Sequence, residues 1–416
     1  MDEVLSPGAS YLCSLVIILT ILVFTLRVQG KTKDVSYLFV VMNGVALFSF
    51  FLQQSSLLNL PSLSFFISVF LSLIAFPLGY QMINRGTSAA VSYRSRVESL
   101  RYKLHAGRML FANRCGYFFY LAGYLYELSQ AGGIFPLLAA DKLQAYYTFP
   151  INFVHYLVVA SIPISIIYAY LTFFRNKGFW FDHVFVFIII VLNTLILARS
   201  IVMTQVFIIV YIWFLHRRYA LKLSTVTSIS LLLLSFITII GYYRTGDSLR
   251  VILDIGGLSH WSELATPFAW PYLYFSTAVE NFRDVYMNTV IDDLQTVTLG
   301  ARYIFTYVLT LLQLKDYIPN SEPIDFSAGG FNTFGLYLSA FYDFYIFFPL
   351  FFLILGSFVA FFERNRRPSF CLFFPYIVYC VFTSPVNDYF GQFFTLVYWV
   401  YIWLVVVFAH KKRLSR

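Results

Sequence analysis

Apolar runs long enough to cross a lipid bilayer recur along this chain, and they restrict its fold more than any other feature. A membrane-spanning α-helix needs about 20 consecutive apolar residues, and its backbone must satisfy its own hydrogen bonds because lipid offers no partners. The chain supplies such runs repeatedly, for example at 63–82 and 393–409, and confines most of its charged residues to the connections. The sequence therefore predicts an all-α, polytopic membrane protein.

These runs predict about 11 transmembrane helices, or as many as 13 if two pieces of one long connection also enter the membrane. The predicted spans are 11–26, 37–53, 63–82, 109–128, 151–174, 181–197, 201–215, 225–243, 345–362, 370–385 and 393–409. Composition agrees, because 59% of the residues are hydrophobic, only 12% are charged, and the mean hydropathy is +0.73. Soluble domains are more polar, so we expect residues 1–416 to form a single integral membrane domain.

Basic residues are concentrated in alternate connections. One set, comprising 27–33, 85–108, 175–177, 217–222, 364–367 and 411–416, holds 21 of the 29 Lys and Arg residues. Such connections face the cytoplasm in most membrane proteins. The distribution predicts an N-terminus outside and a cytoplasmic C-terminus, and it explains the net charge of +9 without a nucleic-acid partner.

One connection on the outer side is much longer than the others. We expect residues 244–344 to form a large loop with short helices, and connections of this length are usually functional. Cations are few on this side, and arginine suits bidentate contact with phosphate oxygens. The candidate anion-binding residues are Arg199, Arg244, Arg250, Arg283 and Arg302.

Four of these five arginines also have a structural alternative. Arg199 interrupts an apolar run where two spans meet, so it either binds an anion or extends to the water interface. Asp247 and Asp254 are possible ion-pair partners for the arginines at 244 and 250, and Glu280 and Asp284 flank Arg283 in the same way.

Several other outer residues are candidates for acid–base chemistry or substrate contact. Asp343 and His260 are candidate general bases, although Asp343 alternatively caps a helix and a lone histidine is more often structural. Asn332 and Thr333 are predicted helix caps and substrate contacts, and Asp388 is a further substrate contact. His155 lies about a turn inside the fifth span from the same side.

The sequence gives no sign of a metal or nucleotide cofactor. Its four cysteines lie in apolar runs without the spacing of metal ligands: Cys13, Cys115, Cys371 and Cys380. Walker, dinucleotide-binding, HExxH and GxSxG motifs are all missing from the sequence. An enzyme acting on the outer side without a nucleotide needs a substrate that is already activated, such as one linked to a lipid.

The segment FNTFGLYLSAFYDFYIF at 331–347 carries a resemblance to a known family. With the long outer loop before it, the segment resembles the O-antigen polymerase (Wzy-type oligosaccharide repeat unit polymerase) family of bacterial inner membranes. The matching positions are Asn332, Thr333, Asp343 and Phe344. Arg199 and Arg244 are similar to two arginines of that family. The glycine expected after the Asp-Phe pair is Tyr345 in this chain.

The resemblance implies a multi-pass protein of the bacterial inner membrane that acts at its periplasmic face. The reaction it implies transfers a growing glycan from undecaprenyl pyrophosphate to a new lipid-linked repeat unit, without nucleotide or metal. Both donor and acceptor are then undecaprenyl-pyrophosphate-linked glycans, and a chain-length regulator is a candidate partner. The arginines would hold the pyrophosphate, and Asp343 or His260 would accept a hydroxyl proton.

Two alternatives stay open at the level of sequence. An O-antigen ligase also has many spans, a large periplasmic loop and outer arginines. A lipid-linked oligosaccharide flippase or another transporter would show matching halves and charges deep in several spans. Here the halves do not match, and Arg114 is the only clearly intramembrane cation that the sequence predicts.

Overall fold

The computed structural model describes residues 4–28, 35–84, 89–139, 145, 155–196, 198–217, 253–262, 265–288, 333, 335–390 and 392–411. Its named elements are all helical, and the β-type pairing recorded among these residues is limited to two isolated bridges. The predicted all-α class is therefore confirmed.

The helices follow the predicted spans closely. Their bounds are α1 Pro7–Val28, α2 Val35–Phe51, α3 Leu63–Asn84, α4 Ala89–Lys103, α5 Ala106–Gln130, η1 Pro136–Leu138, α7 His155–Val159, α8 Ser161–Ala169, η2 Tyr170–Phe174, α9 Trp180–Leu195, α10 Arg199–Arg217, α13 Thr266–Asn288, α15 Leu336–Phe344, η6 Tyr345–Phe347, α16 Phe348–Arg364, α17 Pro368–Thr383 and α18 Phe393–Ala409. Each predicted span overlaps a helix of the described residues except 225–243, which lies outside them. The number of spans and their orientation stay predictions.

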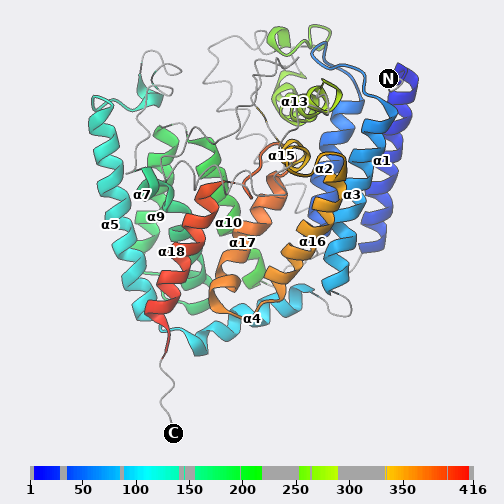
Figure 1. Cartoon of the computed structure of the whole chain (residues 1–416). Coiled ribbons are helices and arrows are strands. Elements are labelled where there is room, and N and C mark those ends of the chain that lie inside the picture. The colour runs from blue at the N-terminus through cyan, green and yellow to red at the C-terminus, as the bar shows by residue number, and fades with distance from the viewer. Residues whose placement is uncertain are drawn as a thin grey trace, which may run out of the picture. The chain divides into compact units, whose positions relative to one another are not determined.

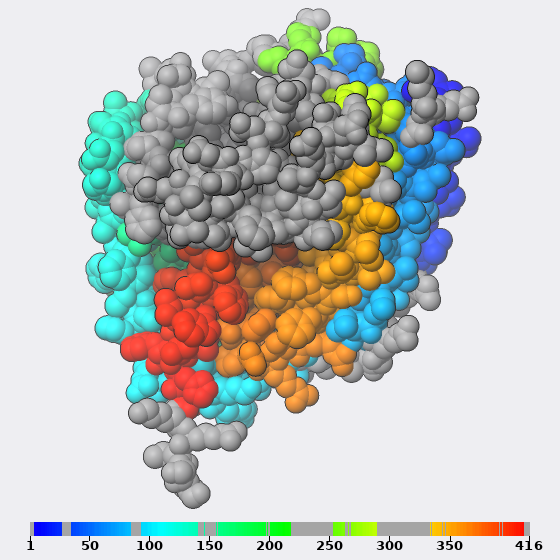
Figure 2. Space-filling view, in the orientation of Figure 1, coloured from blue at the N-terminus to red at the C-terminus, as the bar shows by residue number. Residues whose placement is uncertain are grey.

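Several of these helices have the length and composition of membrane spans. Four are long and apolar enough to cross a membrane: Pro7–Leu26, Leu63–Asn84, Leu157–Phe174 and Ser200–Arg217. Large apolar side chains also lie exposed along helix faces, as with Leu350, Ile354 and Phe358 on α16. The outer side chains of α16 (orange) and of α18 (red) are visible in the space-filling view (Figure 2). Such stripes suit contact with lipid rather than water.

Contacts divide the chain into two compact units. The first comprises Met1–Thr87, Asp247–Phe361 and Cys380–Phe393, and the second comprises Ser88–Gly246, Phe362–Tyr379 and Phe394–Arg416. Each unit thus combines segments from distant parts of the sequence. The expectation of one membrane domain over the whole chain stays a prediction.

In the first unit, α13 and α15 lie crosswise to the long helices. Figure 1 shows them nearly end-on, whereas α1, α2, α3 and α16 run the length of the unit. The start of α13 packs on the segment that follows α2, where the backbone N–H of Gln54 donates to the Tyr272 hydroxyl at 2.9 Å. The Phe282 ring packs against Phe65, Phe341 and Phe348 in the core. Part of the predicted outer loop is therefore folded onto the bundle.

In the second unit, several basic connections meet at one end. The N–H of His105 donates to the carbonyl oxygen of Ala409 at 2.8 Å, which joins the start of α5 to the end of α18. Lys103 Nζ donates to the carbonyl oxygen of Arg366 at 3.1 Å, and Arg175 Nη1 donates to that of Leu104 at 3.3 Å. The helix α4, which the sequence analysis had treated as a charged connection, runs across this end (Figure 1). We call it the basic end of the second unit.

Candidate functional site

The predicted site residues differ in how far the structure describes them. Four lie outside the described ranges: Arg244, Arg250, Arg302 and Asn332. For Arg199 and Asp343 the backbone alone is described, at the first residue of α10 and in the last turn of α15. The roles assigned to these six residues stay predictions. The other four, Arg283, Thr333, His260 and Asp388, belong to the first unit.

Arg283 lies between two carboxylates of its own helix. Its Nη1 atom is 2.8 Å from Oδ1 of Asp284 and 3.7 Å from Oε1 of Glu280, and its Nη2 donates to the carbonyl oxygen of Leu60 at 3.4 Å. Only 15% of the Arg283 side chain is exposed, and both carboxylates are buried. The guanidinium is thus already engaged, which favours the structural alternative over pyrophosphate binding.

Glu280 joins α13 to the segment that follows α2. Its Oε2 accepts a hydrogen bond from the backbone N–H of Asn59 at 3.2 Å, and its Oε1 accepts one from Nδ2 of the same residue at 2.9 Å. Burial raises the pKa of Glu280 to about 8, and the Asp284 carboxylate acts in the same direction, against the Asn59 hydrogen bonds and the Arg283 charge. Two carboxyl groups face one arginine here, so retention of one proton leaves the cluster neutral.

Thr333 connects α13 to the start of α15. Its side chain is buried, its hydroxyl lies 3.1 Å from that of Thr277, and its carbonyl oxygen accepts from Nδ2 of Asn281 at 3.0 Å. Thr333 therefore makes its hydrogen bonds within the first unit, and its predicted contact with a substrate stays a prediction.

The prediction that Thr333 caps this helix is wrong, because α15 begins at Leu336 with Gly335 as its N-cap. The N–H of Leu336 donates to the carbonyl oxygen of Ser384 at 2.8 Å, so a carbonyl of another segment satisfies the helix start. A Cβ at Gly335 would overlap the carbonyl oxygen of Pro385. Because this carbonyl oxygen lies so close, the N-cap position has room for glycine but not for a residue with a Cβ.

The turn between α15 and α16 has an unusual backbone. Tyr345, the C-cap of α15, has φ 49° and ψ −129°. Positive φ is uncommon for a residue with a side chain, whereas glycine adopts it freely. Tyr345 stands where the resemblance predicts glycine. The structure thus has a glycine-type turn two residues after Asp343, although the sequence places a tyrosine there.

His260 and Asp388 occupy peripheral turns of the first unit. His260 is exposed, and no hydrogen bond or ion pair joins it to the described residues. The chain beside it is fixed, since the N–H of Trp261 donates to the carbonyl oxygen of Leu258 at 2.8 Å. Asp388 is partly buried between α17 and α18. The roles predicted for these two residues stay predictions.

The second unit contains an acid–histidine pair that the sequence analysis missed. Nδ1 of His155 lies 3.1 Å from Oε1 and 3.3 Å from Oε2 of Glu127. The Glu127 side chain is fully buried, and 14% of the His155 side chain is exposed. The sequence contained a signal for a buried charge here, because Glu127 continues the face of α5 that carries Tyr117, Tyr120 and Tyr124. A charge on an otherwise buried helix face needs a partner.

This pair lies at the end of the second unit opposite the basic end. At about 1.5 Å per residue, Glu127 is about 30 Å from the first residue of α5, which is about the thickness of the hydrocarbon core. The helices α5 and α9 run in the same direction, because the Tyr120 and Tyr124 hydroxyls donate to the carbonyl oxygens of Ile189 and Leu192. The end of α9, and the start of α10 after it, therefore lie near the end of α5.

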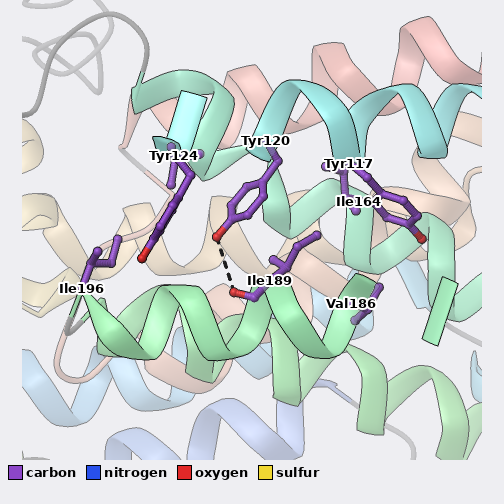
Figure 3. Close-up of a cluster of buried hydrophobic side chains, with 8 residues drawn as sticks. Tyr117, Tyr120, Tyr124, Ile164, Val186, Ile189 and Ile196 are labelled. Atoms are coloured by element: carbon purple, nitrogen blue, oxygen red, sulfur yellow. Dashed lines mark hydrogen bonds between the residues drawn. The ribbon is translucent and has the colours of Figure 1, made fainter. Parts of the chain in front are cut away.

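A buried polar network holds α9 and α10 together. Asn193 accepts from the Tyr120 hydroxyl at 3.0 Å, and its Nδ2 donates to Oε1 of Gln205 at 3.0 Å. Nε2 of Gln205 donates to the carbonyl oxygen of Ser161 and to the Ser165 hydroxyl, both at 3.2 Å. Tyr117, Tyr120 and Tyr124 line the adjoining apolar core with Ile189 and Ile196 (Figure 3). This network fixes the helix that begins at Arg199.

Arg114, which the sequence predicts to lie within the membrane, has a structural partner. Its Nε and Nη2 atoms donate to the two oxygens of Asp182 at 3.1 and 3.0 Å, and the guanidinium lies over the rings of Phe179 and Phe181. Asp182 also accepts from the backbone N–H of Phe179 at 3.1 Å. Arg114 thus anchors the start of α9. In the described part of the chain, no group of three or more His, Cys, Asp or Glu residues could hold a metal ion.

Comparison of the chain with protein-family models, curated proteins and solved structures found no match.

Proposed function

We propose that this chain is a polysaccharide polymerase of the Wzy type in the bacterial inner membrane. It transfers a glycan from undecaprenyl pyrophosphate to a lipid-linked repeat unit at the periplasmic face. Membrane character alone fits many functions, so the proposal depends on features near the predicted substrate-binding segment.

The observation that carries the proposal is the backbone at Tyr345. The family segment ends in Asp-Phe-Gly, and this chain has Asp343, Phe344 and Tyr345. Tyr345 nevertheless has φ 49°, which is the conformation that a glycine would adopt with least strain. Strain of about 1–3 kcal/mol in such a residue persists only where the surrounding structure enforces it, and it is most frequent at functional sites. The geometry thus agrees with the resemblance where the sequence departs from it.

The arrangement of the second unit supports a site on the outer side. Its basic end corresponds to connections that the positive-inside rule assigns to the cytoplasm. The other end contains Glu127, His155 and the start of α10 at Arg199. A cation and a proton acceptor at one end are what transfer from a pyrophosphate donor requires.

The proposed chemistry divides between these groups. Arg199, Arg244 and Arg250 bind the donor pyrophosphate and stabilise the negative charge that develops on it as the sugar–phosphate bond breaks. The acceptor hydroxyl oxygen bonds to the anomeric carbon, its proton passes to a base, and the lipid pyrophosphate leaves with the bonding electron pair. Arg283 takes no part in this scheme because Glu280 and Asp284 occupy its guanidinium.

The direct test reconstitutes the purified protein in liposomes with an undecaprenyl-pyrophosphate-linked repeat unit and no nucleotide. We expect a ladder of lipid-linked polymer, which Arg244→Ala should abolish while the single repeat unit stays on its carrier. A wild-type protein that leaves the repeat unit unextended would overturn the proposal.

Gene deletion separates the alternatives. Surface glycan of one repeat unit is expected for a polymerase, loss of all surface glycan for a ligase, and a repeat unit trapped on the cytoplasmic face for a flippase.

A further inference from the structure

The Glu127–His155 pair has the geometry of an oriented imidazole. Both carboxylate oxygens of Glu127 approach the same ring nitrogen, Nδ1, at 3.1 and 3.3 Å. A carboxylate only accepts hydrogen bonds, so Nδ1 carries the proton in this arrangement. The other nitrogen, Nε2, forms no hydrogen bond to the described residues and is left with its lone pair. Fixing one nitrogen by a carboxylate is how an imidazole is prepared to accept a proton at the other.

Among the described residues, apolar side chains lie beside the pair. Phe394 lies edge-on to the imidazole with ring centroids 6.3 Å apart. One turn from each partner, Tyr124 and Val158 belong to the buried cluster that also contains Ile196. Water is therefore excluded from the Glu127 side, and electrostatic interactions are stronger there than in solvent. The 14% exposed His155 side chain is the more accessible member of the pair.

The pair also lies at the right end of the unit for the proposed reaction. Tyr124 and Ile196 lie at one end of the cluster in Figure 3, where α9 gives way to the start of α10 at Arg199. His155 is thus at the same end as an arginine assigned to the pyrophosphate. His260, the base candidate from the sequence, has no orienting partner among the described residues.

We propose that His155 is the general base of the polymerisation, with Glu127 as its positioning residue; this inference rests on the proposed function. Nε2 of His155 accepts the proton of the acceptor sugar hydroxyl while the hydroxyl oxygen bonds to the anomeric carbon of the donor glycan. The bond from that carbon to undecaprenyl pyrophosphate breaks, and its electron pair leaves with the phosphate oxygen. The imidazolium then returns its proton to water. Glu127 keeps the proton on Nδ1 and stabilises the positive charge of the ring.

The competing explanation is that the pair only anchors α7 to α5. Two substitutions separate the explanations. His155→Gln keeps an N–H donor that can reach Glu127 but removes the base. Glu127→Gln keeps a hydrogen-bond acceptor for Nδ1 but removes the negative charge. Both variants preserve much of a structural link, so an anchoring role predicts small effects on the rate.

The experiment measures kcat and KM for the lipid-linked repeat unit in liposomes, together with the thermal midpoint of each variant. Loss of a general base lowers kcat by about 10²–10⁴-fold, and we expect this for His155→Gln with unchanged KM and thermal midpoint. Glu127→Gln should lower kcat less, again at constant KM. Because the two act as a unit, the double variant should be no slower than His155→Gln alone. His410→Gln, an exposed histidine at the basic end, is the matched control.

These measurements distinguish failure of the proposed function from failure of the assignment to His155. A wild-type protein that makes no polymer overturns the proposed function and this assignment with it. If the wild type is active and His155→Gln retains kcat within a few-fold, only the assignment to His155 is overturned. A fall in kcat that parallels a lower thermal midpoint supports the anchoring role instead. Additive effects in the double variant exclude Glu127 as the residue that positions His155.

Discussion

Alanine at Gly79 or Gly356 should separate α3 from α16 and destabilise the first unit. A Cβ at Gly79 would overlap the carbonyl oxygen of Leu353, and a Cβ at Gly356 would overlap that of Phe76. Both obstacles are backbone atoms, so no side-chain rotation relieves them. The Ser357 hydroxyl also lies 3.0 Å from the Gly79 carbonyl oxygen, across the same crossing. Small residues at such crossings let membrane helices approach closely.

Three contributions set the size of the destabilisation, one favourable and two unfavourable. Alanine is favoured over glycine in a helix interior by about 0.5–1 kcal/mol. Insertion of a methyl group into a close-packed contact costs about 1–3 kcal/mol, and a lost interhelical hydrogen bond costs about 0.6 kcal/mol. We therefore expect each single substitution to destabilise by about 1–2 kcal/mol. Separation of the helices by one alanine makes room for the other. The double variant should therefore lose less stability than the two single variants lose together.

The assay is reversible unfolding in mixed micelles of mild detergent and dodecyl sulfate. Gly8→Ala in α1 is the control, because nothing lies within 4 Å of a Cβ at that position. It should leave the free energy of unfolding unchanged or slightly higher. Unfolding midpoints for Gly79→Ala and Gly356→Ala equal to that of Gly8→Ala would refute the close crossing of α3 and α16.

Three further predictions concern single polar or strained positions. Gln205→Leu removes the acceptor of the Asn193 amide and should destabilise the protein by about 1–3 kcal/mol. Thr204→Val on the same helix serves as the control. Equal thermal midpoints for these two variants would contradict the network. Since the folded-state pKa of Glu280 is raised from 4.5 to about 8, the folded protein binds more protons than the unfolded chain in that window. Stability should therefore fall as pH rises from 4.5 to about 8, and Glu280→Gln should flatten this part of a pH–stability curve. Tyr345→Gly should relieve about 1 kcal/mol of backbone strain and preserve polymer formation, whereas a β-branched Tyr345→Val should lower the thermal midpoint.

Helix positions were largely predictable because lipid imposes one simple requirement. The apolar run at 63–82 became α3, and that at 393–409 became α18. The helix α4 was missed because its many basic residues resemble an ordinary charged connection. Its buried residues Tyr93, Val97 and Leu100 nevertheless recur at helical spacing. Charge density thus concealed a periodicity that the sequence contained.

The candidate site was less predictable because its contacts join distant segments. The sequence identified Glu280 and Asp284 as possible partners of Arg283, since all three are near neighbours on one helix. It gave no indication of Asn59, which reaches Glu280 from 221 positions away. The pairing of Glu127 with the histidine at 155 likewise depends on how α7 packs on α5. Helical periodicity marks a buried charge but does not identify its partner.

The two buried glutamates differ in how their interactions would respond to a proton transfer. Glu280 contacts a guanidinium and the amide donors of Asn59, and these partners keep the same charge near neutral pH. Among the described residues, the Glu127 carboxylate is hydrogen-bonded to an imidazole alone, and its attraction to that ring increases when His155 takes up a proton and becomes positive. Interactions that strengthen as charge develops in a transition state lower the activation barrier of the reaction, whereas interactions of constant strength only stabilise the fold. The cluster at Glu280 therefore joins α13 to the segment that follows α2, and the interaction energy of the Glu127–His155 pair would change on proton transfer to His155, as the proposed role requires.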